Sequence, residues 1–236
     1  MSFISSEFIN EYTLNIFTDA SFTKVQGRDY TCGGAVATIN GSIVDIEYRI
    51  YNDSTSNYGE LEALSLGVGL ASKWRNRVNR INIFSDSQVS IFGIRDRIHN
   101  WTLGKDGKLH GYGGTVIKNQ DLFVEMVYII TRNQLPINFY HQKGHVSVNN
   151  YDSLNNAIHV FCSSNGIREQ VDINLIKFIT DMNNYVDKYT RKKLHTEKLN
   201  VAIKPAFHFT PMDGFDMTRE YFSNLTNQGG LNNEEK

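Results

Sequence analysis

The order of strand-like and helix-like patterns is the feature that most limits the folds open to this 236-residue chain. The first fifty residues contain three strand-like runs, the first of which alternates apolar and polar side chains as a half-buried strand does. These runs are residues 12–18, residues 33–39 after a loop around residues 20–32, and residues 43–50 after the Asn40-Gly41 pair. Asn-Gly favours the tight turn of a β-hairpin, so we expect these three strands to be antiparallel.

Helices and strands then alternate along the chain. Apolar residues return every three or four positions over residues 58–75, which predicts a helix. The further expected elements are strand 80–85, helix 87–98, a loop over 102–117, helix 119–132, strand 137–142 and a helix from about residue 152. Three hairpin strands followed by two strands separated by helices indicate an α/β fold with a mixed five-stranded sheet flanked by helices.

The C-terminal part differs in character from the rest. We expect residues 1–165 to form one domain and residues 166–236 an extension. Apolar spacing predicts an amphipathic helix over about 169–198, which ends in a basic cluster at residues 191–193. Two uses of this helix are open: its apolar stripe covers the sheet, or its basic end adds contacts to phosphates. After residue 200 we expect an irregular tail.

Composition excludes several classes of protein and partner. The net charge is −1 from 24 basic and 25 acidic residues, so binding of a polyanion would need a local basic patch. Cys32 and Cys162 have no metal-ligand spacing and suit a reducing compartment. The N-terminal residues include Glu7 and no basic cluster, unlike a secretory signal, and no apolar run approaches the roughly 20 residues of a membrane span. We therefore expect a monomeric cytoplasmic protein without a membrane partner.

Three acidic residues stand where expected strands end or the first long helix begins. Asp19 follows the first strand, Glu60 lies in the first turn of the first long helix, and Asp86 follows the fourth strand. The first and fourth strands would be neighbours, so Asp19 and Asp86 would emerge side by side. Ligand sites of α/β folds lie outside the carboxyl ends of the strands.

Each of these acids also has an ordinary structural explanation. Asp19 would sit in a turn, Glu60 would form a capping box with Asn57, and Ser85 or Asp86 would cap the next helix. Together these explanations require three acids to meet by accident at one end of the sheet. Carboxylates that meet without basic partners repel one another strongly in a low dielectric, and a bound cation removes that cost. Ligands that are all oxygen favour a hard ion, Mg²⁺ or Mn²⁺.

Five segments of the chain resemble those of type 1 ribonuclease H, in the same order and near the same spacings. They are FTDAS, SNYGELEA, SDSQ followed by IHNW, KNQDLF and KGH, over about residues 12–160. The resemblance implies a ribonuclease H-like fold, with the five-stranded mixed sheet expected above. It also implies an endonuclease that hydrolyses the RNA strand of RNA/DNA hybrids with two Mg²⁺ ions, for which Mn²⁺ is a substitute. Neither the resemblance nor the rest of the sequence identifies a protein partner.

The resemblance also assigns residues to the chemistry. The implied metal ligands are Asp19, Glu60, Asp86 and Asn155. His145, in KGH, would assist proton transfer or product release. Asn155 stands ten residues after the histidine, where the family's fourth carboxylate is expected, and its amide oxygen can bind a metal ion but brings no charge. Asp152, one turn earlier on the same helix face, is the other residue that could complete the set, although we favour Asn155.

Substrate contacts follow from the same resemblance. The implied residues are Ser21, Asn57, Gln88, Asn119 and Phe123. Asn57 and Gln88 would face the minor groove, where 2′-hydroxyl groups distinguish RNA from DNA. Asn119 and Phe123 would form a pocket for a phosphate of the DNA strand, with Phe123 in place of the tryptophan common there. A basic stretch lies in the region of the family's hybrid-gripping protrusion, or is simply a solvated loop; it contains Lys105, Lys108 and Lys118.

Two other functions compete with this interpretation. One is a nucleic-acid-binding or assembly module that keeps the fold with a weakened site, but such a module has no chemical need for clustered acids. The other is a related nuclease or resolvase that acts on DNA, against which the matches at Asn57 and Gln88 argue. We therefore predict an endoribonuclease specific for RNA/DNA hybrids.

Overall fold

The computed structural model describes residues 5–197 and residue 201. The tail expected after residue 200 lies outside this range, apart from residue 201. The strands are β1 (Thr13–Val25), β2 (Arg28–Ile39), β3 (Ser42–Asn52), β4 (Arg80–Ser85), β5 (Thr102–Leu103), β6 (Leu109–His110) and β7 (Ile137–His141). The α-helices are α1 (Ser5–Phe8), α2 (Ser56–Trp74), α3 (Gln88–Phe92), α4 (Gln120–Arg132), α5 (Tyr151–Asn165) and α6 (Ile173–Glu197).

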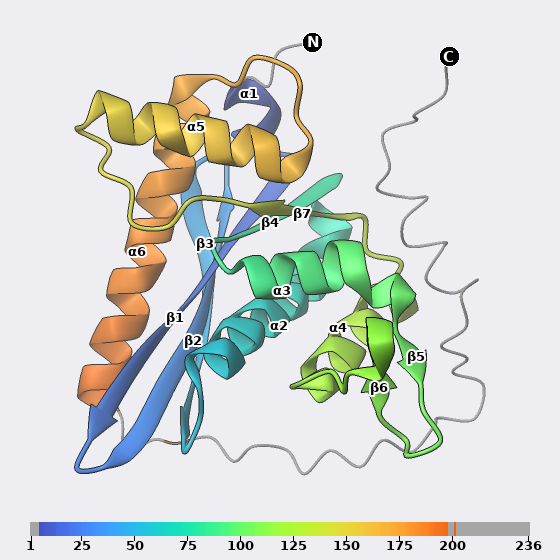
Figure 1. Cartoon of the computed structure of the whole chain (residues 1–236). Helices are drawn as coiled ribbons and strands as arrows, with labels where there is room; N and C mark the ends of the chain where they lie inside the picture. The colour runs from blue at the N-terminus through green and yellow to red at the C-terminus, as the bar shows by residue number, and fades with distance from the viewer. Residues whose placement is uncertain (1–4, 198–200, 202–236) are drawn as a thin grey trace, which may run out of the picture.

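Five of the strands form one mixed sheet, in the order β3-β2-β1-β4-β7. β1 pairs antiparallel with β2, and β2 with β3, whereas β4 runs parallel to both β1 and β7. Figure 1 shows this sheet with helices on both of its faces. The α/β fold and the mixed five-stranded sheet predicted from the sequence are confirmed.

The first hairpin is longer than expected. The loop predicted around residues 20–32 is wrong, because β1 and β2 continue in register as far as Val25 and Arg28. Gln26 and Gly27, with φ of 50° and 80°, form the connection, and two consecutive positive φ angles suit the twist of a tight hairpin. Gln26 is an uncommon residue for such a turn, so the sequence does not announce it. The turn predicted at Asn40-Gly41 is confirmed, with φ of 50° and 73°.

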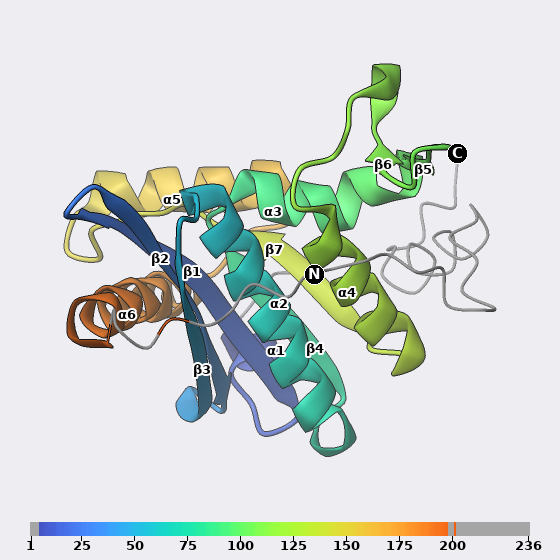
Figure 2. The same cartoon turned by 90° about the horizontal axis from the view of Figure 1, so that it is seen from below.

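Helices cover the sheet in two layers, visible in Figure 2 as α2 and α4 on one face and α5 and α6 on the other. Side chains alternate along β1, so Ile16 belongs to the core under α2 and α4, and Phe17 to the core under α5 and α6. The buried stripe of α6 includes Leu175, Ile179 and Val186. The predicted use of this stripe, to cover the sheet, is confirmed. None of the described helices is both long and apolar enough to cross a bilayer.

Two segments after β4 differ from prediction. The helix expected over residues 87–98 is interrupted, because α3 gives way to a π-helical turn at 93–97 and a 3₁₀ turn at 98–100. The ring of Phe123 packs so tightly on Gly93 that a Cβ there would lie 2.6 Å from it. The loop expected over 102–117 contains the short β5–β6 pair, which stands out from the helix layer in Figure 2.

Helix α2 lies unusually close to the sheet. A Cβ at Gly33 of β2 would lie 2.8 Å from the carbonyl oxygen of Gly59 and 2.9 Å from the backbone nitrogen of Ala63. Both atoms belong to the backbone of α2, so no side chain can rotate away. Gly33 therefore sets the distance between α2 and the sheet, and with it the position of the first turn of α2.

Gly33→Ala should lower the free energy of unfolding by about 1–3 kcal/mol, because the new methyl group pushes α2 off the sheet. The matched control is Gly69→Ala. Gly69 lies within α2, and a Cβ added there would have no atom within 4 Å. The control should raise stability by up to about 1 kcal/mol, because alanine favours the helix. Denaturant unfolding measures both, and equal effects of the two changes would contradict the close approach.

Candidate active site

The parallel pairing of β1 and β4 brings two acids side by side. Thr18 pairs with Ser85 at the ends of the two strands, and Asp19 and Asp86 are the next residues of each. Asp19 is only 7% exposed and Asp86 is half-buried. This arrangement agrees with the one predicted from strand order.

Glu60 joins the two aspartates from the first turn of α2. One carboxylate oxygen of each of the three residues lies within 4.8 Å of the others, and we call Asp19, Glu60 and Asp86 the acidic triad. The capping box predicted for Asn57 and Glu60 is wrong. Thr55 caps α2 instead, since its hydroxyl accepts a hydrogen bond from the Tyr58 N–H at 3.2 Å. The Glu60 carboxylate is therefore not used as a cap.

Asp86 does not cap a helix either. Ser87 is the N-cap of α3, with its hydroxyl accepting from the Ser90 N–H at 3.4 Å. The Ser85 hydroxyl accepts instead from the Ser87 N–H at 3.1 Å, one position before the helix. The cap predicted at Ser85 or Asp86 is thus wrong by one or two residues. The Asp86 carboxylate is left to the acidic triad.

Burial and mutual repulsion act on all three carboxyl groups. Burial and then the charge of Asp86 raise the pKa of Asp19 to about 8. Burial and the charges of the two aspartates raise the pKa of Glu60 well above its ordinary value. Burial also raises the pKa of Asp86, although the charge of His145 and a hydrogen bond from Asn183 oppose this. The fully ionised triad is therefore unfavourable unless a positive charge joins it.

The donor set of the triad fits a divalent cation. The Oε2 atom of Glu60 is buried and has no hydrogen-bond partner in the described part of the chain. Leaving a buried polar atom unpaired costs about 1–3 kcal/mol, so this orientation is favourable when a ligand takes up the oxygen. Carboxylate oxygens without nitrogen or sulfur donors suit Mg²⁺ or Mn²⁺.

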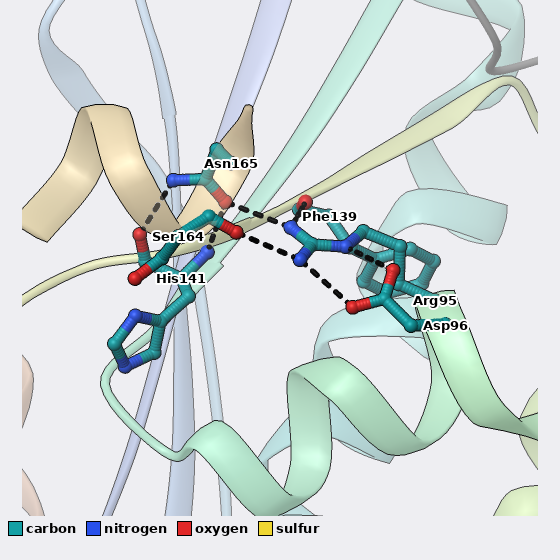
Figure 3. Close-up of polar contacts among 6 residues, drawn as sticks. All are labelled: Arg95, Asp96, Phe139, His141, Ser164 and Asn165. Carbon is teal, nitrogen blue, oxygen red and sulfur yellow. Dashed lines mark hydrogen bonds and ion pairs between the residues drawn. The ribbon is translucent and has the colours of Figure 1, made fainter. Parts of the chain in front are cut away.

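Figure 3 shows a hydrogen-bond network that joins the ends of β7 and α5 to the π-helical turn. This network also contacts the backbone of Asp86. His141, the last residue of β7, places Nε2 3.2 Å from the Asp86 carbonyl oxygen. Asn165, the last residue of α5, accepts the His141 N–H at 2.9 Å and donates to the His141 carbonyl at 2.7 Å. Arg95 donates to Asn165 Oδ1 at 2.8 Å and to the Ser164 carbonyl at 2.9 Å. The ends of β7 and α5 and the π-helical turn are thus joined beside the acidic triad.

The loop after β7 lies directly against Asp86. A Cβ at Gly144 would overlap the Asp86 carboxylate, so this approach requires glycine. The next residue, His145, is exposed and has a φ of 53°, an uncommon angle for a residue with a side chain. The structure therefore places the predicted His145 beside the triad, on a loop that a tight backbone holds in place.

The two residues considered for the fourth metal ligand lie on the exposed side of α5. Asn155 and Asp152 both face solvent in the first turns of this helix. Within residues 5–197, the acids close enough to share one ion are those of the triad, and Asp152 is not among them. The assignment of Asn155 as a ligand stays a prediction.

The implied substrate residues fall into two groups. Asn57 and Gln88 are exposed in the first turns of α2 and α3, next to Glu60 and Asp86 in sequence. Ser21 is instead 8% exposed, and its Oγ lies 2.9 Å from Thr190 Oγ1 on α6. The first group is accessible to a nucleic acid, whereas the Ser21 hydroxyl already has a partner.

The predicted phosphate pocket on α4 is also partly buried. Phe123 is 3% exposed, and its ring meets that of Trp101 edge-on at a centroid distance of 4.9 Å. Phe123 therefore lies in the core and can shape such a pocket only from beneath. Asn119 precedes α4 half-buried, with a left-handed φ of 53°. The lysines at 105, 108 and 118 are all exposed on or beside the β5–β6 segment.

Several residues around the triad were missed from the sequence. They are Arg95, His141, Asn165, Asn183, Asp187, Thr190 and Arg191. Asn183, Asp187 and Thr190 are polar residues spaced by four and three within the amphipathic pattern of α6, which does indicate one helix face. The sequence does not reveal which part of the sheet this face meets.

Comparison with known proteins agrees with the fold. The model of one protein family, described as RNase H, matches residues 11–160, well over half of the chain. The resemblance predicted from the motifs is therefore confirmed. A search of curated proteins gives no match.

Among solved structures, the chain is similar to the native prototype foamy virus protease–reverse transcriptase. The TM-score is 0.52 at 14% identity, over 78% of this chain and 21% of that chain, which supports a shared fold. It is also similar to the foamy viral protease–reverse transcriptase in complex with RNA/DNA hybrid, with a TM-score of 0.48, 15% identity, and 70% and 20% of the two chains covered. A third is LC11-RNase H1 in complex with RNA/DNA hybrid, with a TM-score of 0.41, 15% identity, and 55% and 85% covered. The chain thus spans about a fifth of the length of these two foamy virus chains.

The raised pKa values predict how stability depends on pH without a metal ion. Asp19 binds a proton up to about pH 8 when folded but only up to about 3.8 when unfolded, so stability falls as pH rises between these values. Asp19→Asn should remove part of this dependence and raise the Tm at pH 8 by at least about 3 °C. Burial lowers the pKa of His141, which acts in the opposite direction below pH 6.5 but is common to both proteins.

The measurement is the Tm of both proteins from pH 5 to 8 in the presence of a chelator. Asp181→Asn, which alters an exposed acid of α6, is the control and should follow the wild type. Parallel curves for Asp19→Asn and the wild type would contradict the raised pKa.

Proposed function

The chain belongs to the RNase H family, and from this premise we propose that it is an endoribonuclease that hydrolyses the RNA strand of RNA/DNA hybrids. The observation that carries the proposal is the acidic triad, in which a buried Glu60 oxygen has no hydrogen-bond partner among the described residues. Three carboxylates at this distance, with raised pKa values, form a favourable site when divalent cations neutralise them. A binding module would gain nothing from this arrangement.

The metal ligands in this proposal are Asp19, Glu60 and Asp86, with Asn155 as a neutral fourth donor. When bound, two divalent cations, Mg²⁺ or Mn²⁺, would supply an activated water for attack on the phosphodiester and positive charge to stabilise the leaving 3′ oxygen. The protein orients the site through β1, α2 and β4 and through the network behind Asp86. His145, on the loop against Asp86, transfers a proton or assists product release at the open side.

Substrate recognition would use the exposed residues around the triad. Asn57 and Gln88 are exposed at the starts of α2 and α3, close in sequence to Glu60 and Asp86, where amide groups can hydrogen-bond 2′-hydroxyl groups and base edges. The lysines at 105, 108 and 118 are exposed on or beside the β5–β6 segment, whose place in the fold is seen in Figure 2. With a net charge of −1, attraction to phosphates depends on such a local group.

We predict that the protein with Mg²⁺ cuts the RNA strand of an RNA/DNA hybrid and leaves duplex DNA, duplex RNA and single-stranded RNA intact. Asp86→Asn should lower the rate on the order of 10²-fold or more, because it removes charge that holds the cations. Asp181→Asn is the control and should cut at the wild-type rate. Labelled substrates resolved on gels measure each reaction.

The other outcomes separate the competing functions. A hybrid that is bound but not cut would favour the nucleic-acid-binding module with a weakened site. Cutting of duplex DNA would favour the DNA nuclease or resolvase. Equal cutting by Asp86→Asn and the wild type would contradict the role of the acidic triad.

A further inference from the structure

Helix α6, which lies beyond the matched residues 11–160, reaches the acidic triad. Phe17, Asp19 and Ser21 alternate with their neighbours along β1 and so share one face of the sheet. Phe17 meets the ring of Phe178 at a centroid distance of 5.5 Å, and Ser21 Oγ lies 2.9 Å from Thr190 Oγ1. Asp19, between them, therefore faces the part of α6 between residues 178 and 190.

The neighbouring strand locates this part of α6 more closely. Asp19 is paired across the sheet with Gly34 of β2. A Cβ at Gly34 would lie 2.5 Å from Thr190 Cγ2 and 3.8 Å from Val186 Cγ1, so the helix segment 186–190 lies over the Asp19–Gly34 pair. One turn earlier, Asn183 accepts a hydrogen bond from Gln142 Nε2 at 2.6 Å, immediately after β7.

Asp187 lies between these two anchoring points. Asn183, Asp187 and Thr190 are spaced by four and three residues and so share one face of the helix. Burial is the main cause of the raised pKa of each triad member, and the negative charge of Asp187 adds to it in all three. The side chain of Asp187 is 22% exposed. Asp187 is thus a fourth acid within electrostatic reach of the triad.

The partner of Asp187 is a cation of the same helix. Arg191, one turn later, donates to both carboxylate oxygens of Asp187 at 2.8 Å, and the Arg191 side chain is 68% exposed. The charge of Arg191 also acts on Asp19, where it opposes the rise in pKa. Arg191 therefore offsets part of the negative charge at this end of the sheet.

A cavity next to the triad gives Asp187 room to act on a bound ion. It has a volume of about 430 Å³ and lies between β1 and α6. Asp187, Arg191 and His145 line it together with Ala20 and Ser21, the two residues after Asp19. A water molecule occupies about 30 Å³ in the liquid, so a hydrated ion fits. Mg²⁺ usually keeps several of its waters when it binds to protein.

We propose that Asp187 is a fourth acidic group of the cation site, which holds a bound divalent cation through one of its waters from the side of α6. Arg191 neutralises Asp187 in the absence of the cation and competes with the cation for it. The proposal uses the same cation site as the proposed function and in that respect rests on it. It makes α6 part of the site, in addition to the cover that this helix gives the sheet.

The test is the affinity of the full chain for Mn²⁺, measured by calorimetry and by the Mn²⁺ electron-paramagnetic-resonance signal, without nucleic acid. Asp187→Asn should weaken binding about tenfold, as loss of a group that orients a metal or its water does. Arg191→Gln should strengthen binding, because a competing positive charge is removed. Asp181→Asn, on the exposed side of the same helix, should leave the affinity unchanged.

The opposite effects expected for Asp187→Asn and Arg191→Gln on Mn²⁺ affinity distinguish an electrostatic role of the pair from a structural one. If the Asp187–Arg191 pair only held α6 in place, both changes would weaken binding to the same extent, and the proposal would be overturned. Unchanged affinity in Asp187→Asn would also overturn it. If the wild type cuts hybrids but Asp187→Asn leaves the Mn²⁺ affinity unchanged, this inference is contradicted and the proposed function stands. If the variants change the Mn²⁺ affinity as expected but the wild type cuts no nucleic acid, the proposed function is contradicted and this inference stands.

Discussion

The mutual repulsion of Asp19, Glu60 and Asp86 is the constraint on which the rest of the structure depends. Carboxylates this close raise one another's pKa values, and the burial that makes them effective ligands raises them further. Such a group persists only if the surrounding elements hold it rigidly. Directly behind the two aspartates, Phe17 and Phe84 are paired in the parallel strands and stack at a centroid distance of 5.0 Å. Packing of the strands thus offsets part of the electrostatic cost.

Each member of the triad is supported by a different part of the fold. Asp19 is fixed by the centre of the sheet, and Glu60 by the close contact of α2 with Gly33. Asp86 depends on the network of His141, Asn165 and Arg95. It also depends on the loop after β7, in which Gly144 lies against the Asp86 carboxylate. Because these supports come from distant parts of the sequence, the site forms only when the whole sheet and both helix layers are in place.

The sequence predicted the fold and the triad because both follow from local patterns. Alternation, the Asn40-Gly41 turn and the strand–helix order were sufficient for the sheet, and strand order alone placed Asp19 beside Asp86. The predicted cap positions were wrong, because several residues that can cap a helix adjoin one another at both helix starts, and backbone geometry selects Thr55 and Ser87. The turn at Gln26-Gly27 was not predicted, because the pairing of β1 with β2 overrides the weak turn preference of these two residues. Asp187 and Thr190 could not be assigned, because the contact of α6 with β1 is long-range.

The most direct test of this account is a crystal structure of the protein grown or soaked with Mn²⁺, with anomalous scattering used to locate the ions. The account predicts anomalous peaks between the carboxylates of Asp19, Glu60 and Asp86, with the Oε2 atom of Glu60 among the ligands. Ordered crystals at neutral pH and millimolar Mn²⁺ with no peak at these carboxylates would contradict it. The three acids would then be a protonated cluster in the structure and not a cation site.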